Sequence, residues 1–537
     1  MRLRILLLIL LSKLPAVAAG AEQPDCEKLA EIKSTSFRII DIQPVPAREA
    51  LPAHCRLHGR IAGAVNFELR LPHSWNGKFL MVGNGGYLGI FFDQSYGLSR
   101  GFTTASTDTG HTGPDPRFAF NNREAEIDFA HRAVHATVIA AKEAIEHFYG
   151  RPPEFSYFRG CSTGGRQGLM EAQRFPEDFD GWSIGAPIYD YTDKQTYNAS
   201  WVAQALFAND RQGYVPHTKL KSLGSAVYAR CDETDGLRDG LIDDPRNCDF
   251  DAERDLPICP DGTDRRDCFT AVQIAAIEKI YAGPGDHVYP GHVKGGEWLA
   301  AAGDQMTGGW DTYITGRLRP AKNDQNTIGQ MDRDPYGGDE FLPVQLRNAI
   351  SFFKYLAFEE DRPEFDVLRD LDFANVPDTS YMADMMNADD PDLSHIGTSG
   401  KKILLWHGWA DVGLIPLRTI QYYKAVQQTV GKDRTDKFLR LFMVPGMYHC
   451  EGGPGPDIFD DLAALESWVE RAEGPERMIA YKTSGQNGFY PHRAPRGDPQ
   501  ESDAVLRSRP LCRFPLVARY NGQGSLDEAQ NFRCVQP

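Results

Sequence analysis

The chain has 537 residues, of which 41% are hydrophobic and 11% aromatic, and its formal net charge is −16. That length is more than one ordinary domain needs, and the composition suits a globular protein with a sizeable core. Because 74 acidic residues stand against 58 basic ones, nucleic acid and anionic membrane surfaces are disfavoured as main partners.

Residues 1–21 have the pattern of a secretory signal peptide. Arg2 and Arg4 form a basic start, residues 5–11 form an apolar run, and small-x-small cleavage sites end at Ala18 and Ala21. The apolar run is too short to span a bilayer, so we expect no membrane anchor. A secreted or periplasmic protein matures in an oxidising environment, where the 10 cysteines are expected to form disulfides.

A buried strand is predicted at Lys78–Val82, and the glycine-rich stretch Gly83–Tyr87 follows it directly. A glycine-rich loop after an early strand and upstream of a nucleophile can present a backbone N–H group to a developing oxyanion. Gly85 and Gly86 are therefore candidate oxyanion donors, and the alternative is a plain turn. A further strand at 102–107 comes next along the chain.

A long helix is predicted at 127–148, because apolar residues recur there at helical spacing before Gly150. An aromatic strand-like run at 154–158 then leads into Gly160-Cys161-Ser162-Thr163-Gly164-Gly165, and a helix-forming run at 167–174 follows. A serine on a tight strand-to-helix turn is the nucleophile elbow of an α/β-hydrolase. The alternative is an ordinary loop, since glycine and serine are common there.

Another strand at 181–187 continues the alternation of strands and helices, which indicates a parallel α/β sheet. The alternation stops over 188–399, which we interpret as an inserted lid domain, because long loops at strand ends carry binding function. It resumes with the strand Lys402–Trp406, so a separate domain on a linker is the weaker interpretation. The α/β-hydrolase catalytic domain is then formed by 22–187 together with 400–537.

A catalytic triad is predicted from Ser162, Asp411 and His449, which follow the chain order of an α/β-hydrolase and each come just after a predicted strand. Asp411 would orient the imidazole, and His449 would take the proton of the Ser162 hydroxyl and return it to the leaving alcohol.

Three other residues compete for these roles. His407 is a rival base, but it lies nearer the strand end and before the acid, which favours a packed or turn-stabilising histidine. Asp108 and Glu451 are rival acids, and Glu451 is disfavoured because it follows the histidine in the chain.

Cys161 directly precedes the predicted nucleophile and Cys450 directly follows the predicted base. If serine and histidine meet within about 3 Å, their neighbours are close enough for a disulfide, whose Cα atoms lie about 4.4–6.8 Å apart. In the loop-entropy model this bond stabilises the fold by about 5–6 kcal/mol as an upper figure. Two unrelated buried thiols are the alternative.

An acidic loop runs from Cys231 to Asp244 and repeats aspartate and glycine. Carboxylates this dense repel one another unless a cation lies among them, and calcium accepts carboxylate and backbone oxygens from one compact loop. A bond from Cys231 to Cys248 would join the ends of the loop. A solvated acidic loop is the alternative, and a calcium ion here would be structural.

The combination of Gly160–Gly165, Asp411 and His449-Cys450 resembles the tannase and feruloyl esterase family, whose hallmark is a Cys-Ser, Asp and His-Cys arrangement with a disulfide joining the triad. The resemblance covers nearly the whole chain after the signal peptide, including Asp108–His111. It implies an α/β-hydrolase with a lid between the nucleophile and acid strands, and an oxyanion hole formed by the backbone N–H of Thr163 and of a glycine in Gly83–Gly86.

The resemblance also implies a calcium site and a set of disulfides. The calcium ligands would be the side chains of Asp232, Asp235 and Asp239 and the backbone carbonyls of Leu237 and Leu241. The disulfides would be Cys26–Cys55, Cys161–Cys450, Cys231–Cys248, Cys259–Cys268 and Cys512–Cys534.

The implied activity is hydrolysis of esters of aromatic acids through an acyl-enzyme, on a small-molecule or plant-polymer-derived ester. Feruloyl or related hydroxycinnamoyl esters are our first expectation, and galloyl esters of tannins or a terephthalate monoester are the alternatives. A serine peptidase and an inactive binding protein are the competing functions of other classes. Five lid aromatics are candidate substrate contacts that core packing would also explain: Trp310, Tyr313, Phe352, Phe353 and Tyr355.

Overall fold

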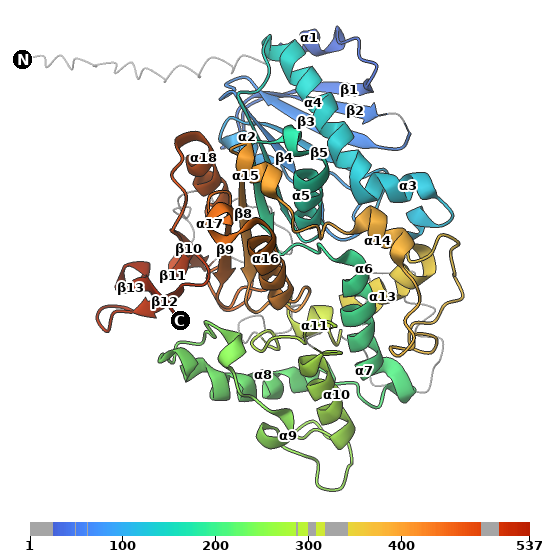
Figure 1. Cartoon of the computed structure of the whole chain (residues 1–537), viewed down its shortest axis with the longest axis vertical. Helices are drawn as coiled ribbons and strands as arrows, with labels where there is room; N and C mark the ends of the chain where they lie inside the picture. The colour runs from blue at the N-terminus through green and yellow to red at the C-terminus, as the bar shows by residue number, and fades with distance from the viewer. Residues whose placement is uncertain are drawn as a thin grey trace, which may run out of the picture.

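A nine-stranded sheet is the centre of the computed structural model (Figure 1). The structure describes residues 25–48, 50–61, 63–285, 288–298, 308–316, 342–484 and 504–537, so the predicted signal peptide at 1–21 lies outside the described residues. The strand order is β1-β2-β3-β5-β4-β6-β7-β8-β9. The bounds are β1 Phe37–Val45, β2 His54–Ile61, β3 Asn66–Pro72, β4 Lys78–Val82, β5 Thr103–Thr107, β6 Phe155–Cys161, β7 Gly181–Gly185, β8 Lys402–Gly408 and β9 Leu439–Val444.

The sheet is antiparallel from β1 to β5 and parallel from β5 through β4, β6, β7 and β8 to β9. The parallel part holds all the strands predicted from the sequence, and the α/β fold class is confirmed. Because the carboxyl ends of parallel strands share one edge of a sheet, loops that follow β4, β6, β8 and β9 come together there.

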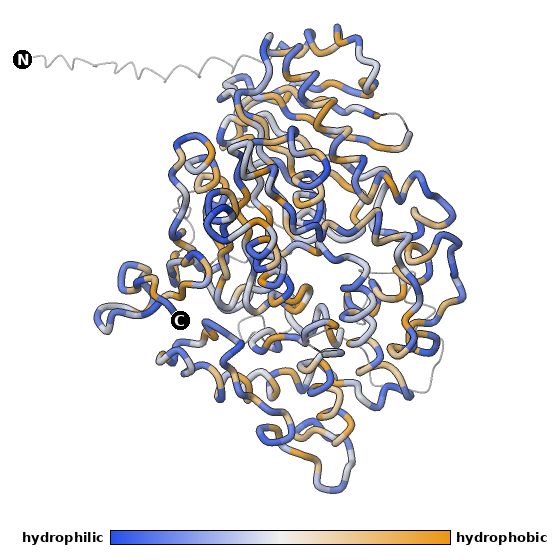
Figure 2. The backbone as a smooth tube through the Cα atoms, viewed as in Figure 1, coloured by the Kyte–Doolittle hydropathy of each residue, from blue (hydrophilic) through white to orange (hydrophobic). Residues whose placement is uncertain are grey.

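Helices cover both faces of the parallel strands, which therefore read as continuous apolar runs. Phe79 and Met81 of β4 pack with α4 (Ala133–Tyr149), α5 (Thr163–Arg174) and α16 (Pro416–Val430). The alternate residues of that strand, Leu80 and Val82, pack on the other face with α2 (Ser95–Ser99) and α18 (Asp461–Arg471). Figure 2 shows the hydrophobic colour concentrated along these central elements.

The segment predicted as a lid lies between β7 and β8, and its described part contains helices and loops. Its green to yellow-green helices from α7 (Ser200–Arg211) to α11 (Trp310–Tyr313) occupy the lower part of Figure 1. The helices that matter below are η4 (Lys194–Ala199), α7 (Ser200–Arg211), α8 (His217–Cys231), α10 (Ala271–Ala282), α11 (Trp310–Tyr313) and α13 (Val344–Tyr355). All of these helices except η4 contribute to one hydrophobic cluster, which includes Leu223, Ile277 and Trp310.

The chain after α18 forms two small antiparallel hairpins. β10 (Arg477–Thr483) pairs with β11 (Val505–Cys512), and β12 (Val517–Tyr520) pairs with β13 (Phe532–Val535). The Cys512–Cys534 disulfide joins the two hairpins. Within the described residues, no helix combines the length and the apolar character that a membrane crossing requires.

The start of α5 packs directly against the loop after β4. A Cβ atom added to Gly164 would lie 2.7 Å from the backbone oxygen of Asn84 and 3.1 Å from the carbonyl carbon of Gly83. The loop is also held by the backbone N–H of Asn84, which donates to Gln167 Oε1 at 2.9 Å. Glycine at this position therefore lets the elbow helix and the glycine-rich loop approach each other.

Replacing Gly164 with alanine should destabilise the protein and lower its activity. In an open helix alanine is favoured over glycine by about 1 kcal/mol, but here the new methyl meets fixed backbone, and overpacking costs about 1–3 kcal/mol. Denaturant unfolding and kcat for an ester substrate measure the two effects. An alanine variant that is more stable than the parent and fully active would contradict this packing argument.

Candidate active site

Ser162 lies at the sharp turn between β6 and α5. Its backbone has φ 64° and ψ −122°, a combination that costs a non-glycine residue about 1–3 kcal/mol and persists only where the surroundings enforce it. Its N–H donates to the Gly185 carbonyl at 3.1 Å, and its own carbonyl accepts from Arg166 N–H at 3.0 Å. The side chain is nearly buried, at 8% exposure, which is the geometry of a nucleophile elbow.

Asp411 and His449 meet in the loops after β8 and β9. His449 Nδ1 lies 2.7 Å from Asp411 Oδ2, and because a carboxylate only accepts, Nδ1 carries the proton of this bond. The Nε2 atom of the ring is thereby left for the serine. In the described part of the chain no hydrogen bond yet joins Ser162 to His449, and such bonds commonly tighten only when substrate is bound.

The carboxylate of Asp411 is fully buried and surrounded by donors. Oδ1 accepts from the backbone N–H of Gly413 at 2.7 Å and of Leu414 at 2.9 Å. Oδ2 accepts from His449 and also from His407 Nε2 at 3.0 Å. Burial alone would raise the pKa of Asp411, but attraction to His449 and the hydrogen bonds from both imidazoles outweigh it and lower that pKa below its usual range. The acid therefore stays ionised.

The Cys161–Cys450 disulfide joins the elbow to the loop of the base. The two Cα atoms lie 6.0 Å apart, and the bond spans 289 residues of sequence. Cys450 has a positive φ of 66°, and so does Ser162, the residue after Cys161. The tertiary structure must enforce both of these backbone conformations. The other disulfides are Cys26–Cys55, Cys231–Cys248, Cys259–Cys268 and Cys512–Cys534.

The glycine-rich loop lies beside the elbow, where an oxyanion hole is expected. The hydroxyl of Thr163 donates to the Gly86 carbonyl at 3.1 Å. Gly86 has φ +51°, a conformation that glycine adopts without strain. Among the described residues, the backbone N–H groups of Thr163, Gly85 and Gly86 make no hydrogen bond outside regular helix pairing, so all three predicted donors are available to a ligand.

Asp108, a rival acid in the sequence, has a different role. Its carboxylate accepts from the backbone and side-chain amides of Asn66, at 2.9 and 2.6 Å, and from Gly110 N–H at 3.0 Å. Nearby, His111 Nε2 lies 2.7 Å from the Tyr87 carbonyl. The Asp108 contacts hold the turn after β5 and the start of β3, the His111 contact reaches the end of the glycine-rich stretch, and none of them involves His449.

One of the five lid aromatics contacts the triad. The Tyr313 ring meets the His449 ring edge to face, with centroids 5.4 Å apart. Trp310, Phe352 and Phe353 are fully buried in hydrophobic clusters, and Tyr355 packs against Phe120. The sequence alone does not distinguish Tyr313 from the other four aromatic residues, because its contact with His449 depends on the tertiary fold of the segment between β7 and β8.

The acidic loop folds around its own aspartates. Oδ1 of Asp232 accepts from Gly240 N–H at 2.9 Å, Oδ1 of Asp235 from Leu237 N–H at 2.9 Å, and Oδ1 of Asp239 from Leu241 N–H at 3.2 Å. Burial and then mutual repulsion raise the pKa of Asp232. Crowded carboxylates of this kind fit a cation.

Two features of this loop were not evident from sequence. Asp243 is half-buried, and burial followed by repulsion from Asp235 and Asp239 raises its pKa well above the usual range. Arg509 of the C-terminal hairpins forms an ion pair with Asp239, and Arg519 donates to the Asp235 carbonyl at 2.8 Å. The two arginines come from a distant part of the chain, and their positive charges offset part of the repulsion between the aspartates.

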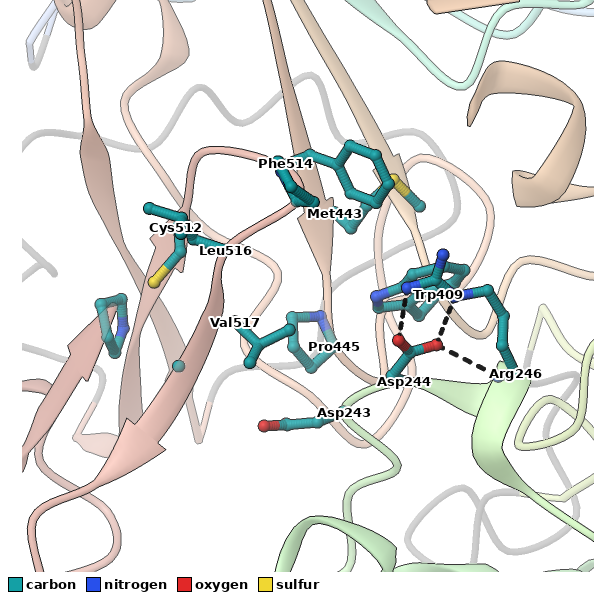
Figure 3. Close-up of a pocket in the computed structure, with 13 residues that line it drawn as sticks. Asp243, Asp244, Arg246, Trp409, Met443, Pro445, Cys512, Phe514, Leu516 and Val517 are labelled. Carbon is teal, nitrogen blue, oxygen red and sulfur yellow. Dashed lines mark hydrogen bonds and ion pairs between the residues drawn. The ribbon is translucent and has the colours of Figure 1, made fainter. Parts of the chain in front are cut away.

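The same region packs against the loop of the acid (Figure 3). Asp244 forms an ion pair with Arg246 at 2.5 Å, and the Arg246 guanidinium lies 5.2 Å from the Trp409 ring. Trp409 is two residues before Asp411, so the contact between Arg246 and Trp409 links the segment enclosed by the Cys231–Cys248 disulfide to the loop that carries Asp411.

A second group of possible metal ligands lies behind the elbow helix. The ligand atoms of His135, Glu171 and Asp178 converge within 4.8 Å of one another, the only such group of three in the parts of the chain described. Calcium in the acidic loop would thus need its carboxylates to move together. At the second group Lys142 Nζ donates to the Asp178 carbonyl at 2.5 Å, so an ammonium already supplies positive charge there.

Comparison with known proteins agrees with this geometry. The family model described as tannase and feruloyl esterase matches residues 50–535. A mono(2-hydroxyethyl) terephthalate hydrolase of Piscinibacter sakaiensis is 31% identical and covers 93% of this chain and 87% of its own. A probable feruloyl esterase B-2 of Aspergillus flavus is 30% identical over 84% of this chain and 81% of its own.

Solved structures give the same result. The crystal structure of feruloyl esterase B from Aspergillus oryzae superposes with a TM-score of 0.77 at 26% identity, covering 94% of this chain and 98% of that one. The tannin acyl hydrolase from Aspergillus niger has a TM-score of 0.68 at 21% identity over 96% and 95% of the two chains, which shows a shared fold.

Removing the Cys161–Cys450 bond should impair activity more than stability alone explains. Cys161→Ala and Cys450→Ala are expected to lower kcat alike, because each frees the base loop from the elbow. The loop-entropy model assigns about 6 kcal/mol to this bond of 289 residues and about 3 kcal/mol to the 22-residue Cys512–Cys534 bond.

The control is therefore the Cys512→Ala/Cys534→Ala double variant, which should lower the melting temperature and leave kcat of the folded enzyme near the parent value. Steady-state kinetics and thermal unfolding are measured on all variants. Full turnover in either Cys161→Ala or Cys450→Ala would show that the triad does not need the bond.

Proposed function

The chain belongs to the tannase and feruloyl esterase family, and from this premise we propose that it is a secreted serine carboxylesterase that hydrolyses esters of aromatic acids through an acyl-enzyme. Family membership makes it a carboxylic ester hydrolase. The observation that carries the catalytic assignment is the short His449–Asp411 bond beside a disulfide-linked nucleophile elbow.

In the proposed mechanism His449 acts on both halves of the reaction. Its Nε2 takes the proton of the Ser162 hydroxyl while Oγ attacks the ester carbonyl, and then gives that proton to the departing alcohol oxygen, which leaves an acyl-serine. Water deprotonated by the same nitrogen attacks the acyl carbon, and Ser162 regains its proton as the acid leaves. Asp411 remains ionised and stabilises the imidazolium in each step.

The negative oxygen of each tetrahedral intermediate needs donors that are already in place. We assign this role to the backbone N–H of Thr163 at the start of α5 and to the N–H of Gly85 or Gly86. The Thr163 hydroxyl bond to the Gly86 carbonyl fixes these two segments relative to each other, so the donors need not reorganise during the reaction.

Hydroxycinnamoyl esters such as feruloyl esters are the first proposed substrates. Support comes from relatives named feruloyl esterase, by sequence and by structure. A terephthalate monoester is the second candidate, because a relative named mono(2-hydroxyethyl) terephthalate hydrolase is similar over most of both chains. Both acyl groups present an aromatic ring to the lid, where Tyr313 lies against the base.

Calcium is proposed as a structural ion of the acidic loop, held by the side chains of Asp232, Asp235 and Asp239 and the carbonyls of Leu237 and Leu241. The fit rests on the crowding of these partly buried carboxylates, and burial and repulsion raise the pKa values of Asp232 and Asp235. Bound calcium would supply charge neutralisation and rigidity, and Arg246 against Trp409 would transmit that rigidity to the acid loop.

Export is proposed from the N-terminal pattern at 1–21, with its basic start, apolar run and small-residue cleavage sites. The disulfides of the described chain support it, because such bonds persist in oxidising compartments.

Ser162→Ala should abolish ester hydrolysis without unfolding the protein, lowering kcat by at least about 10³-fold, because the neighbouring Thr163 hydroxyl is engaged with the Gly86 carbonyl and does not replace the nucleophile. The assay compares methyl ferulate, methyl gallate, mono(2-hydroxyethyl) terephthalate and a peptide anilide. The exposed Ser99→Ala variant is the control and should match the parent. Turnover of methyl ferulate above the other three supports the first substrate, and anilide cleavage alone would indicate a peptidase.

Chelation should lower the melting temperature more than it changes kcat. A ligand present at 100-fold its dissociation constant stabilises the folded state by about 2.7 kcal/mol, and calcium added back should restore the melting curve. Asp235→Asn should lose this response. The control is Asp261→Asn, in the separate Cys259–Cys268 loop, which should keep the response to chelator and calcium. A parent protein whose melting temperature changes with neither chelator nor calcium would contradict the calcium site.

A further inference from the structure

His407 contacts the same carboxylate oxygen of Asp411 as His449 does. It is the penultimate residue of β8, and its ring is 1% exposed. Nε2 lies 3.0 Å from Asp411 Oδ2 and 3.2 Å from the Leu414 carbonyl, while Nδ1 lies 2.8 Å from the Thr419 hydroxyl. Each ring nitrogen is therefore engaged by a buried partner.

The protonation of this ring is assigned from its partners. Carboxylate and carbonyl oxygens can only accept, so Nε2 carries a proton and donates to both. The Thr419 hydroxyl can donate, so the neutral ring satisfies every partner when Nδ1 accepts from it.

We propose that His407 is a positioning residue of the triad: its Nε2–H fixes the Asp411 carboxylate in the orientation in which Oδ2 accepts the hydrogen bond from the Nδ1–H group of His449. The proposal rests on the proposed esterase function. With two backbone donors on Oδ1 and two imidazole donors on Oδ2, the carboxylate has no free direction in which to rotate.

The His407 bond also withdraws charge from Oδ2. Without it, more negative charge on Oδ2 would favour the protonated form of His449, which cannot accept the serine proton. Among the residues that the structure describes, Lys194 and His292, both buried in the segment between β7 and β8, also interact electrostatically with Asp411. They are unchanged in variants of His407, so a shift in the pH profile reports on the bond that was removed.

The experiment compares His407→Gln with His407→Met. Glutamine keeps an N–H donor near the position of Nε2, and methionine has nearly the same length and shape but no donor. Hydrogen bonds to charged groups contribute enough to change a rate about 10- to 100-fold. We expect kcat to fall by that factor in His407→Met with KM about unchanged, the acid limb of kcat/KM to move to higher pH, and His407→Gln to recover most of the loss.

Each outcome decides the matter. A folded His407→Met enzyme with parent kcat and an unmoved acid limb overturns the proposal, and so does an equal loss in both variants without a shift of that limb, which would indicate packing alone. If His407→Met does not fold, Thr419→Val takes its place, because it removes the hydroxyl that holds Nδ1 of His407. We then expect a smaller loss of kcat with the same shift of the acid limb. A pH profile like that of the parent enzyme overturns the proposal. An inactive parent enzyme on all esters would instead remove the proposed function.

Discussion

One covalent constraint fixes the active site: the Cys161–Cys450 bond between two loops at the same edge of the sheet. The elbow after β6 and the loop after β9 are separated in the sheet by β7 and β8, so neighbouring strands alone do not hold them together. The bond permits both Ser162 and Cys450 to keep positive φ angles, whose strain the rest of the fold must offset. The disulfide thus holds the loop of Ser162 and the loop of His449 together whether or not a substrate is bound.

The acid is held by a different kind of force. Burying an unpaired carboxylate costs several kcal/mol, and Asp411 avoids that cost because donors occupy both of its oxygens. The same donors determine its chemistry, because they keep it ionised and leave its orientation fixed. Disulfide and buried carboxylate are complementary: the first sets the distance between base and nucleophile, and the second sets the angle of the imidazole.

Sequence predicted those parts of the site whose geometry follows from neighbours along the chain. The order Ser162, Asp411, His449 and the cysteines beside two of them suffice to infer the disulfide between Cys161 and Cys450, and strands such as β4 and β8 are recognisable because both faces are apolar. The contact of His407 with Asp411 could not be predicted, since it depends on the path of the turn after β8. Nor could the approach of Arg509 to Asp239, because 270 residues separate the two and no local pattern records their pairing.

The lid and the triad form one mechanical unit. Within the lid, Gln345 Nε2 donates to the carbonyls of Val412 and Gly413, at 3.2 and 2.9 Å, and Lys194 donates to Gln345 Oε1 at 2.7 Å. Val412 and Leu414 belong to the hydrophobic clusters of the lid helices, so the loop of the acid is partly lid core. A change of lid residues that adapts the enzyme to another acyl group therefore also acts on the orientation of Asp411. If the lid contacts the acyl group as we propose, substitutions there that leave Gln345 and its partners in place are the ones that would alter acyl specificity without moving Asp411.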